Sequence, residues 1–385
     1  MKPVIFIYSI LMLLAISAPD LKAQYLPLQA DLDTLSNISQ IDLSAESIHS
    51  VQFTDPVVFN DPDVIMGSIS SVTVDSGGYV YVADNDQLTI HRFREDGSFI
   101  ESFGRDGEGP GEFRSLIKLR YRDGKVFALD RNQNRITAFS TDSLKDLETI
   151  SLSAEFQSAG SNLRSMPEDF FVLPGNRFLL AFSLVAGDSE QLYFQPVDIF
   201  DPNSGYEGEN EIKIPVRQSV IFQNAGAMGF LYPVYGRRST LYVSRGDSIY
   251  SNWSENILFK SYNTRGEYSG AWYDQIEKQP LRRRQLREHY SDFYMDILSD
   301  EPLPDTWPAI RGFLVDDKHR FWVELVTDDM TVSEWVIVSE AHGLLGKFSM
   351  SAEDTIHVVQ NNLIYMTNVN PDGLEIVKMY RLLLN

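Results

Sequence analysis

The sequence contains no cysteine. This absence excludes disulfides, cysteine nucleophiles and thiolate metal ligands, and it also excludes the lipid-modified cysteine of a lipoprotein. The six histidines are scattered without an HExxH or similar spacing, and no Gly-x-Ser-x-Gly, Walker or EF-hand motif is present. The sequence therefore predicts no metal site, no cofactor and no recognisable catalytic group.

Basic residues are few: 33 Lys and Arg stand against 54 Asp and Glu, giving a net charge of −21. A negative field of this size repels phosphate backbones and anionic lipid surfaces. We therefore expect no nucleic-acid partner. A soluble, acidic monomer is the expectation.

Long apolar runs are also missing, apart from residues 4–16 near the N-terminus. This run follows Lys2, is too short to span a bilayer comfortably, and fits the apolar region of a secretory signal. Ala23 is small enough to precede a cleavage site. We predict a signal peptide over residues 1–23, cleaved after Ala23, and a periplasmic or secreted protein with no integral membrane segment. An uncleaved membrane anchor is the alternative.

The chain does contain an internal repeat, which is the strongest signal in the sequence. Two stretches match at one constant separation of 46 residues, without a gap. The matching pairs are Gly78 and Gly124, Val80 and Val126, Asp84 and Asp130, Ile90 and Ile136, and Phe93 and Phe139. A constant separation across turn, strand and following strand indicates two copies of one structural unit.

Weaker copies of the unit follow, and they bring the total to six. They centre on Phe178–Ala181, Ile249–Tyr250, Phe321–Val323 and Ile364–Met366. Each unit reads as four short strands separated by Gly- or Asp-containing turns. Four antiparallel strands that recur about every 45–55 residues are typical of a propeller. The sequence predicts an all-β, six-bladed β-propeller with four-stranded antiparallel blades.

The last unit ends after its third strand, at the C-terminus of the chain. We expect residues 47–53, which precede the first unit, to supply the missing fourth strand, because such pairing closes the ring and removes open sheet edges. The predicted domains are therefore a signal peptide (1–23), a loosely attached lead-in (24–45) and the propeller (46–385).

Residues 103–113 read FGRDGEGPGEF and join the first two units. Glycines permit backbone conformations that other residues avoid, and proline stiffens the turn. This segment resembles the NHL-type repeat propellers and, more narrowly, the six-bladed β-propeller proteins exported by Bacteroidetes-type bacteria. The resemblance implies the fold and export, and it implies no particular reaction.

The long connections of the predicted propeller gather on one face. They are the links at 104–113, 152–170, 214–238 and 274–308 and the loop at 185–191. Binding residues concentrate on long loops that a rigid scaffold holds in place. We expect any binding site to lie on this long-loop face.

The link at 274–308, between blades four and five, predicts a helical insert. Residues 281–298 carry an apolar stripe at helical spacing, and Pro280 suits the first turn. Four arginines gather at its start: Arg282, Arg283, Arg284 and Arg287. This insert could present arginines to an anionic ligand or partner. Alternatively, it packs on the sheet ends and leaves a solvated basic surface.

Polar residues on the shorter loops are further candidates for ligand binding. Asp84, Asp86, Arg131 and Arg135 follow second strands, and we expect them to ring the channel mouth near Arg105 and Asp106. Alternatively, Asp84 and the equivalent Asp130 bind neighbouring backbone amides in repeated turns, which Asp does well.

Two hypotheses of function follow. The first is a non-enzymatic binding or scaffold propeller that engages an exported protein, a peptide or a glycan through its long-loop face. The second is a propeller enzyme of lactonase or lyase type, which would need inward polar side chains from several blades around a divalent cation. First-strand positions are mostly apolar or small, as at Ser71, Val72, Val74, Leu119, Phe313 and Val315. We therefore favour binding.

Overall fold

The computed structural model describes residues 28–61, 64–152, 166–183, 194–196, 198–203, 205–206, 212–215, 217–224, 227–299, 301–370 and 372–385. The predicted signal peptide, the loop at 185–191 and most of the link at 152–170 lie outside these residues. All helices among the described residues are too short or too polar to cross a membrane.

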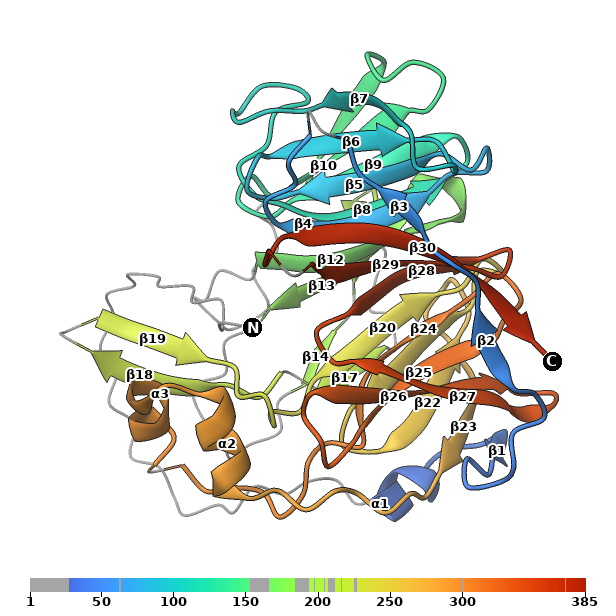
Figure 1. Ribbon diagram of the computed structural model, residues 1–385, viewed down its shortest axis with the longest axis vertical. Coiled ribbons are helices and arrows are strands. Elements are labelled where there is room, and N and C mark those ends of the chain that lie inside the picture. Colours follow the sequence, from blue (N-terminus) through green and yellow to red (C-terminus); the bar gives the residue numbers. More distant parts are fainter. Residues whose placement is uncertain are drawn as a thin grey trace.

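The chain folds into the predicted six-bladed, all-β propeller of four-stranded antiparallel blades (Figure 1). Blade one contains β4 (Ile69–Val74), β5 (Val80–Asp84), β6 (Thr89–Phe93) and β7 (Phe99–Phe103). Blade two contains β8 (Leu116–Arg122), β9 (Lys125–Asp130), β10 (Arg135–Ser140) and β11 (Leu147–Ser151). Blade three contains β12 (Met166–Leu173), β13 (Arg177–Ser183), β15 (Asp198–Asp201) and β16 (Gly205–Tyr206). Blade four contains β20 (Ser239–Val243), β21 (Ile249–Trp253), β22 (Ile257–Tyr262) and β23 (Tyr268–Asp274). Blade five contains β24 (Ile310–Val315), β25 (Phe321–Val326), β26 (Val332–Ser339) and β27 (Gly343–Ser351). Blade six contains β28 (Thr355–Gln360), β29 (Leu363–Val369) and β30 (Glu375–Leu384).

Buried aspartates fix the turn between the first two strands of a blade. In blade one, the carboxylate of Asp75 accepts hydrogen bonds from the amides of Gly77 (2.8 Å) and Tyr79 (2.9 Å). In blade five, Asp316 accepts from the amides of Lys318 and Arg320, both at 2.9 Å. Asp favours such local bonds to the backbone, so the repeated residue produces a repeated turn.

The N-terminal segment closes the ring, as the sequence predicts. Strands β2 (Val51–Phe53) and β3 (Val57–Phe59) both pair antiparallel with β30, and Figure 1 shows them along its free edge. Between them, the amide of Thr54 donates to the carbonyl of Arg381 at 3.1 Å. The closing strand therefore extends to Phe59, beyond the predicted end at residue 53.

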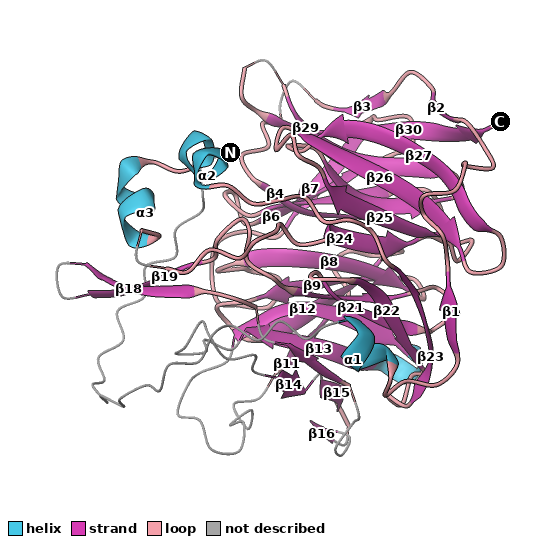
Figure 2. Ribbon diagram, turned by 90° about the horizontal axis from the view of Figure 1, so that it is seen from below, coloured by secondary structure: helices cyan, strands magenta, loops and turns pink. Residues whose placement is uncertain are grey.

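The described part of the lead-in, from residue 28 on, packs on the propeller, so the expectation of loose attachment is wrong for these residues. Helix α1 (Leu28–Leu32) is followed by β1 (Ile38–Gln40), which pairs in parallel with β23 and adds a fifth strand to blade four (Figure 2). Leu32, Ile41 and Leu43 are buried. The outer edge of a blade has unpaired amides and carbonyls, and a strand that covers it satisfies them.

The chain between the lead-in and the closing strand crosses blade five. The Lys347 amine donates to the carbonyl of Leu43, and the amides of Ile48 and His49 donate to the carbonyls of Leu344 and Leu345. Residues 38–59 therefore contact blades four, five and six in turn.

The insert between blades four and five contains two short helices, α2 (Arg283–His289) and α3 (Asp292–Ile297), instead of the single helix predicted over 281–298. Tyr290 between them has an extended backbone (φ −107°, ψ 145°). Its hydroxyl oxygen accepts a hydrogen bond from the amide of Val234 at 2.7 Å. Ser291 and Asp292 are residue types favoured at helix starts, so the sequence also permits a new helix here.

The insert packs on the link that precedes blade four. This link contains a hairpin of β18 (Val220–Asn224) and β19 (Ala227–Leu231), and before it β14 (Phe194–Pro196) pairs with β17 (Lys213–Pro215). Figures 1 and 2 show α2 and α3 beside the hairpin. The shared apolar cluster includes Val220, Leu231, Tyr235, Leu281, Leu286, Tyr290, Tyr294, Leu298 and Trp307.

Candidate functional site

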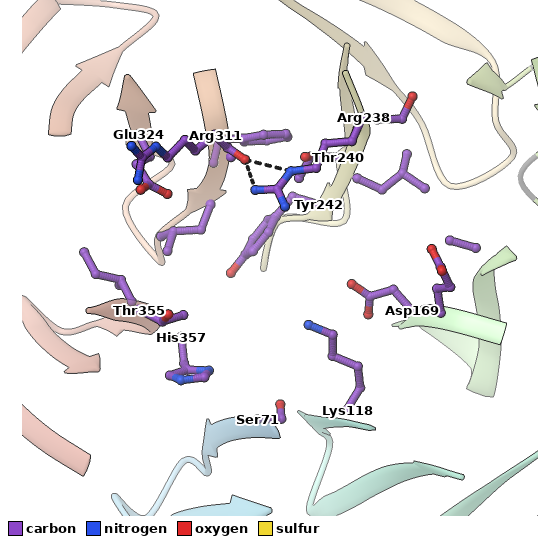
Figure 3. A pocket seen from close by; sticks show the side chains of 18 of the residues that line it. Ser71, Lys118, Asp169, Arg238, Thr240, Tyr242, Arg311, Glu324, Thr355 and His357 are labelled. Atoms are coloured by element: carbon purple, nitrogen blue, oxygen red, sulfur yellow. Dashed lines mark hydrogen bonds between the residues drawn. The ribbon is translucent and has the colours of Figure 1, made fainter. Parts of the chain in front are cut away.

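A cavity of about 640 Å³ occupies the centre of the propeller. The first strands of all six blades (β4, β8, β12, β20, β24 and β28) contribute to its lining. Figure 3 shows side chains that point into this space from several blades. Arg217, in the long link before blade four, and Asp354, in the short connection from β27 to β28, also line it. The cavity therefore lies at the end of the central channel where these links emerge.

Irregularities in the first strands aim polar side chains into the channel. In blades one, two, three, five and six, the pairing of first with second strand skips one residue near the start of the first strand: Ser70, Ile117, Glu168, Arg311 and His357. A β-bulge of this kind redirects the neighbouring side chains. Lys118 and Asp169 directly follow the bulges of blades two and three, and both line the cavity.

The cavity carries several cationic groups in an otherwise acidic protein. Its lining includes Lys118, Arg120, Arg217, Arg238 and Arg311. The expectation that first strands offer mostly apolar or small side chains is therefore wrong for the channel. Periodicity could not show these residues, because the bulges interrupt the alternation of side chains on which it depends.

The carboxylates of the channel are engaged by protein groups. Arg120 donates to Asp169 at 2.8 Å and to the carbonyl of Phe170 at 3.1 Å. The hydroxyl of Ser333 donates to Glu324 at 2.6 Å. Because Asp169 already pairs with Arg120, its negative charge offsets the charges of the other cations in the cavity only in part.

Lys118 differs from the other cations of the cavity. It is half-buried, and no hydrogen bond or ion pair of its amine is found within the described part of the chain. Asp169 favours its charged form, but burial and the positive charges of Arg120 and Arg238 outweigh this effect and lower the pKa of Lys118.

His357, at the bulge of β28, also lines the cavity. Burial lowers its pKa to about 3, and the charges of Lys118 and Arg120 act in the same direction. Its Nε2 lies 3.2 Å from the hydroxyl of Thr367. At neutral pH the imidazole is therefore uncharged.

We expect His357→Gln to make the protein less sensitive to acid. The unfolded chain binds a proton at this histidine below about pH 6.5, whereas the folded chain binds it only near pH 3, so acidification across this window favours unfolding. Urea midpoints at pH 7 and pH 4.5 should fall less in the variant than in the parent. His342→Gln, at an exposed position, is the control. Equal acid sensitivity of parent and variant would contradict the assignment.

The structure places Asp84 in a buried turn. Its carboxylate accepts hydrogen bonds from the amides of Gly67 (2.7 Å), Asp86 (2.9 Å) and Gln87 (3.1 Å). Asp130 makes the equivalent bonds in blade two, to the amides of Arg114, Asn132 and Gln133. These contacts account for both aspartates as turn residues, which is the alternative that the sequence left open. The side chain of Asp86 is exposed.

The other loop candidates stabilise the Gly-rich link or lie near it. Arg105 donates to Glu112 at 2.8 Å, and Asp106 accepts from Arg114 at 3.0 Å. Arg135 donates to the carbonyl of Gly109 at 2.8 Å.

Arg131 approaches the channel more closely than these residues. Its guanidinium lies 3.7 Å from Glu168, which lines the cavity. Arg131 is thus the loop candidate that forms an ion pair with a residue of the channel lining.

The structure does not bring the arginines of the insert into the channel, and none of these four described side chains lines the cavity. Arg283 donates to the carbonyl of Leu298 at 3.1 Å and so ties α2 to the end of α3. Arg282, Arg284 and Arg287 are exposed. Partner binding by them stays a prediction. Within the described ranges, no group of three or more His, Asp or Glu side chains is placed to hold a metal ion.

Comparison with known proteins agrees with this architecture. The family model described as "6-bladed beta-propeller" (DUF5128) matches residues 35–236. A search of the curated proteins finds no match.

Solved structures share the fold at low sequence identity. A duf4221 family member from Bacteroides vulgatus is 10% identical, with a TM-score of 0.56 over 87% of this chain and 99% of that chain. A Bacteroides fragilis protein, named as a candidate for export, is 10% identical, with a TM-score of 0.54 over 90% of this chain and 99% of that chain. Virginiamycin B lyase from Staphylococcus aureus is 12% identical, with a TM-score of 0.41 over 86% of this chain and 88% of that chain.

The likeness to the two Bacteroides structures shows the fold, and at such identities no reaction carries over to this chain. The family match, by contrast, covers more than half of the sequence. The chain therefore belongs to the 6-bladed beta-propeller family DUF5128.

Proposed function

We propose that this protein is an exported binding propeller that takes an anionic ligand into its central channel. The ligand class that fits is a carboxylate-bearing peptide or glycan. The observation that carries the proposal is the cationic lining of the channel, above all the exposed guanidinium of Arg238.

Electrostatics support this choice of ligand. The whole chain has a net charge of −21, so its surface repels anions in general. The recess holds five cationic side chains against four carboxylates, so it is less negative than the surface, and low-dielectric walls focus the field of its cations. Arg238 and Arg311 lie on neighbouring blades and are joined by a bond from the Arg238 Nε to the Arg311 carbonyl at 2.9 Å. This bond orients the guanidinium of Arg238, which lines the cavity (Figure 3).

The insert could extend the binding surface beyond the channel. Helix α2, which ends at His289, packs on the link before blade four, and Arg217 of this link lines the cavity. The exposed Arg284 and Arg287 are on the same helix. A protein partner with an acidic surface would suit them. Neutralising both arginines should weaken capture of such a partner without changing small-ligand binding in the channel.

Export rests on residues 1–23 and on the name of the Bacteroides fragilis relative. The proposed location is the periplasm or the medium, after cleavage at Ala23. Mass spectrometry of the mature protein from the native cell envelope tests this, and a mature N-terminus other than Gln24 would contradict the assigned cleavage site.

Binding of tetraglutamate and of trigalacturonate, measured by calorimetry, tests the anion site. We expect Arg238→Gln to weaken the binding of at least one of these probes about tenfold, because charge-assisted hydrogen bonds contribute about 1.5–3 kcal/mol. Raising the salt concentration should weaken binding as well. The uncharged counterparts tetraglutamine and maltotriose should not bind.

Arg265→Gln is the matched control, because Arg265 is an exposed arginine paired with Glu267 on a surface turn. It should bind the probes as the parent does. Equal affinity for charged and uncharged probes, or no effect of Arg238→Gln, would overturn the proposal.

A further inference from the structure

The amine of Lys118 has an unusual position for a lysine. It extends from β8 directly after the bulge, and Figure 3 shows it pointing into the open centre of the cavity, with Asp169, Tyr242 and His357 around the same space. Lysine is seldom buried without a paired carboxylate. Here Asp169, the acid with the largest influence on the pKa of Lys118, is bound to Arg120 at 2.8 Å.

The surroundings make this amine a better nucleophile than a surface lysine. A lysine is nucleophilic only when it is uncharged, and desolvation or a second cation nearby favours that form. Both effects act on Lys118: burial, together with Arg120 and Arg238, lowers its pKa against the opposing influence of Asp169.

We infer that Lys118 is a nucleophilic lysine that forms an imine with the carbonyl group of a carboxylate-bearing ligand held in the channel. This inference rests on the proposed function, because the cations of the same cavity would bind the carboxylate. It adds the ligand class: anionic aldehydes and ketones, such as 2-oxo acids.

The step needs no further reactant. The nitrogen of Lys118 attacks the carbonyl carbon, a C–N bond forms, and the carbonyl oxygen becomes a hydroxyl. The amine nitrogen then gives up its protons, the hydroxyl leaves as water, and the product is an imine, so that amine and carbonyl yield imine and water.

Two neighbouring groups can carry the protons. Burial raises the pKa of the Tyr242 phenol, which therefore stays protonated and can donate to the leaving hydroxyl. The carboxylate of Asp169 can accept a proton from the nitrogen. Tyr242 packs its ring against Phe171 (5.9 Å) and Phe313 (6.3 Å), so Tyr242→Phe preserves the packing and removes only the hydroxyl.

Trapping by borohydride tests the inference on the intact chain. The protein is incubated at pH 7.5 with 2-oxoglutarate or with pyridoxal 5′-phosphate, reduced, digested and mapped by mass spectrometry. We expect more adduct on Lys118 than on the exposed Lys145, because the lowered pKa of Lys118 raises the uncharged fraction of its amine. Tyr242→Phe should slow trapping.

A second pair of measurements separates binding from chemistry. The parent protein should bind 2-hydroxyglutarate, which lacks the carbonyl, and Lys118→Arg should lose all trapping at this position. If 2-hydroxyglutarate binds but Lys118 is labelled no faster than Lys145, the imine is overturned and the anion site stands. If 2-oxoglutarate, 2-hydroxyglutarate and pyridoxal 5′-phosphate all fail to bind in the channel, both proposals are overturned.

Discussion

Glu255→Ala is expected to lower the free energy of unfolding by about 3–5 kcal/mol, because it removes the carboxylate from a buried ion pair. Arg237 is 1% exposed, and its Nε lies 2.5 Å from Glu255. The amine of Lys278 donates to the other oxygen of the same carboxylate. The variant leaves two cations without this acid in a poorly solvated site.

The ion pair matters to the architecture because it joins three segments. Arg237 also donates to the carbonyls of Tyr235 (3.0 Å) and Thr306 (2.9 Å), so it connects the link before blade four to the end of the insert. Urea denaturation measures the loss. Glu267→Ala, which breaks an exposed pair with Arg265, is the matched control and should cost less than about 1 kcal/mol. A similar, small loss in both variants would contradict this account.

Phe59→Ala is expected to cost about 3–5 kcal/mol as well, through the cavity that it leaves. Phe59 is fully buried on the closing strand β3. Its ring lies 5.8 Å from that of Phe93 in blade one and 6.2 Å from that of Tyr365 in blade six. The side chain therefore fills the junction where the ring closes.

Val58→Ala provides the control for this prediction, since Val58 directly precedes Phe59 in β3 and is 41% exposed. It should change the urea midpoint little, because surface substitutions usually stay within about 0.5 kcal/mol. Equal destabilisation by both variants would show that β3 contributes through its backbone pairing instead of through Phe59.

The repeat predicts the blades because it follows from turns and strand interiors. Gly78 and Gly124, and Asp84 and Asp130, occupy equivalent places, so one separation of 46 residues relates them. The closing strand was predictable for a similar reason: a final blade with three strands needs a fourth from elsewhere.

The channel could not be predicted in the same way. Ser71 pairs with Ala83 and Lys118 pairs with Leu129, so these two first-strand residues are equivalent at a separation of 47, not 46. The first strand of blade two is therefore displaced by one residue relative to the rest of its unit. A displacement of one residue exchanges the two faces of a strand, so a pattern based on the second strand misplaces Lys118.

The break in the insert depends on a tertiary contact. The apolar residues of 281–298 keep helical spacing throughout, and nothing in that spacing marks Tyr290 as extended. The hydrogen bond from the Val234 amide to the Tyr290 hydroxyl comes from a link over fifty residues earlier in the chain, at a sequence separation of 56.

The course of residues 38–59 also bears on when the fold can form. These residues are made early in synthesis, yet β23, β27 and β30, which they contact, are made much later. Contacts between such distant parts of a sequence form slowly. The circular arrangement of sheets thus cannot be completed until β30, the last strand, has been synthesised.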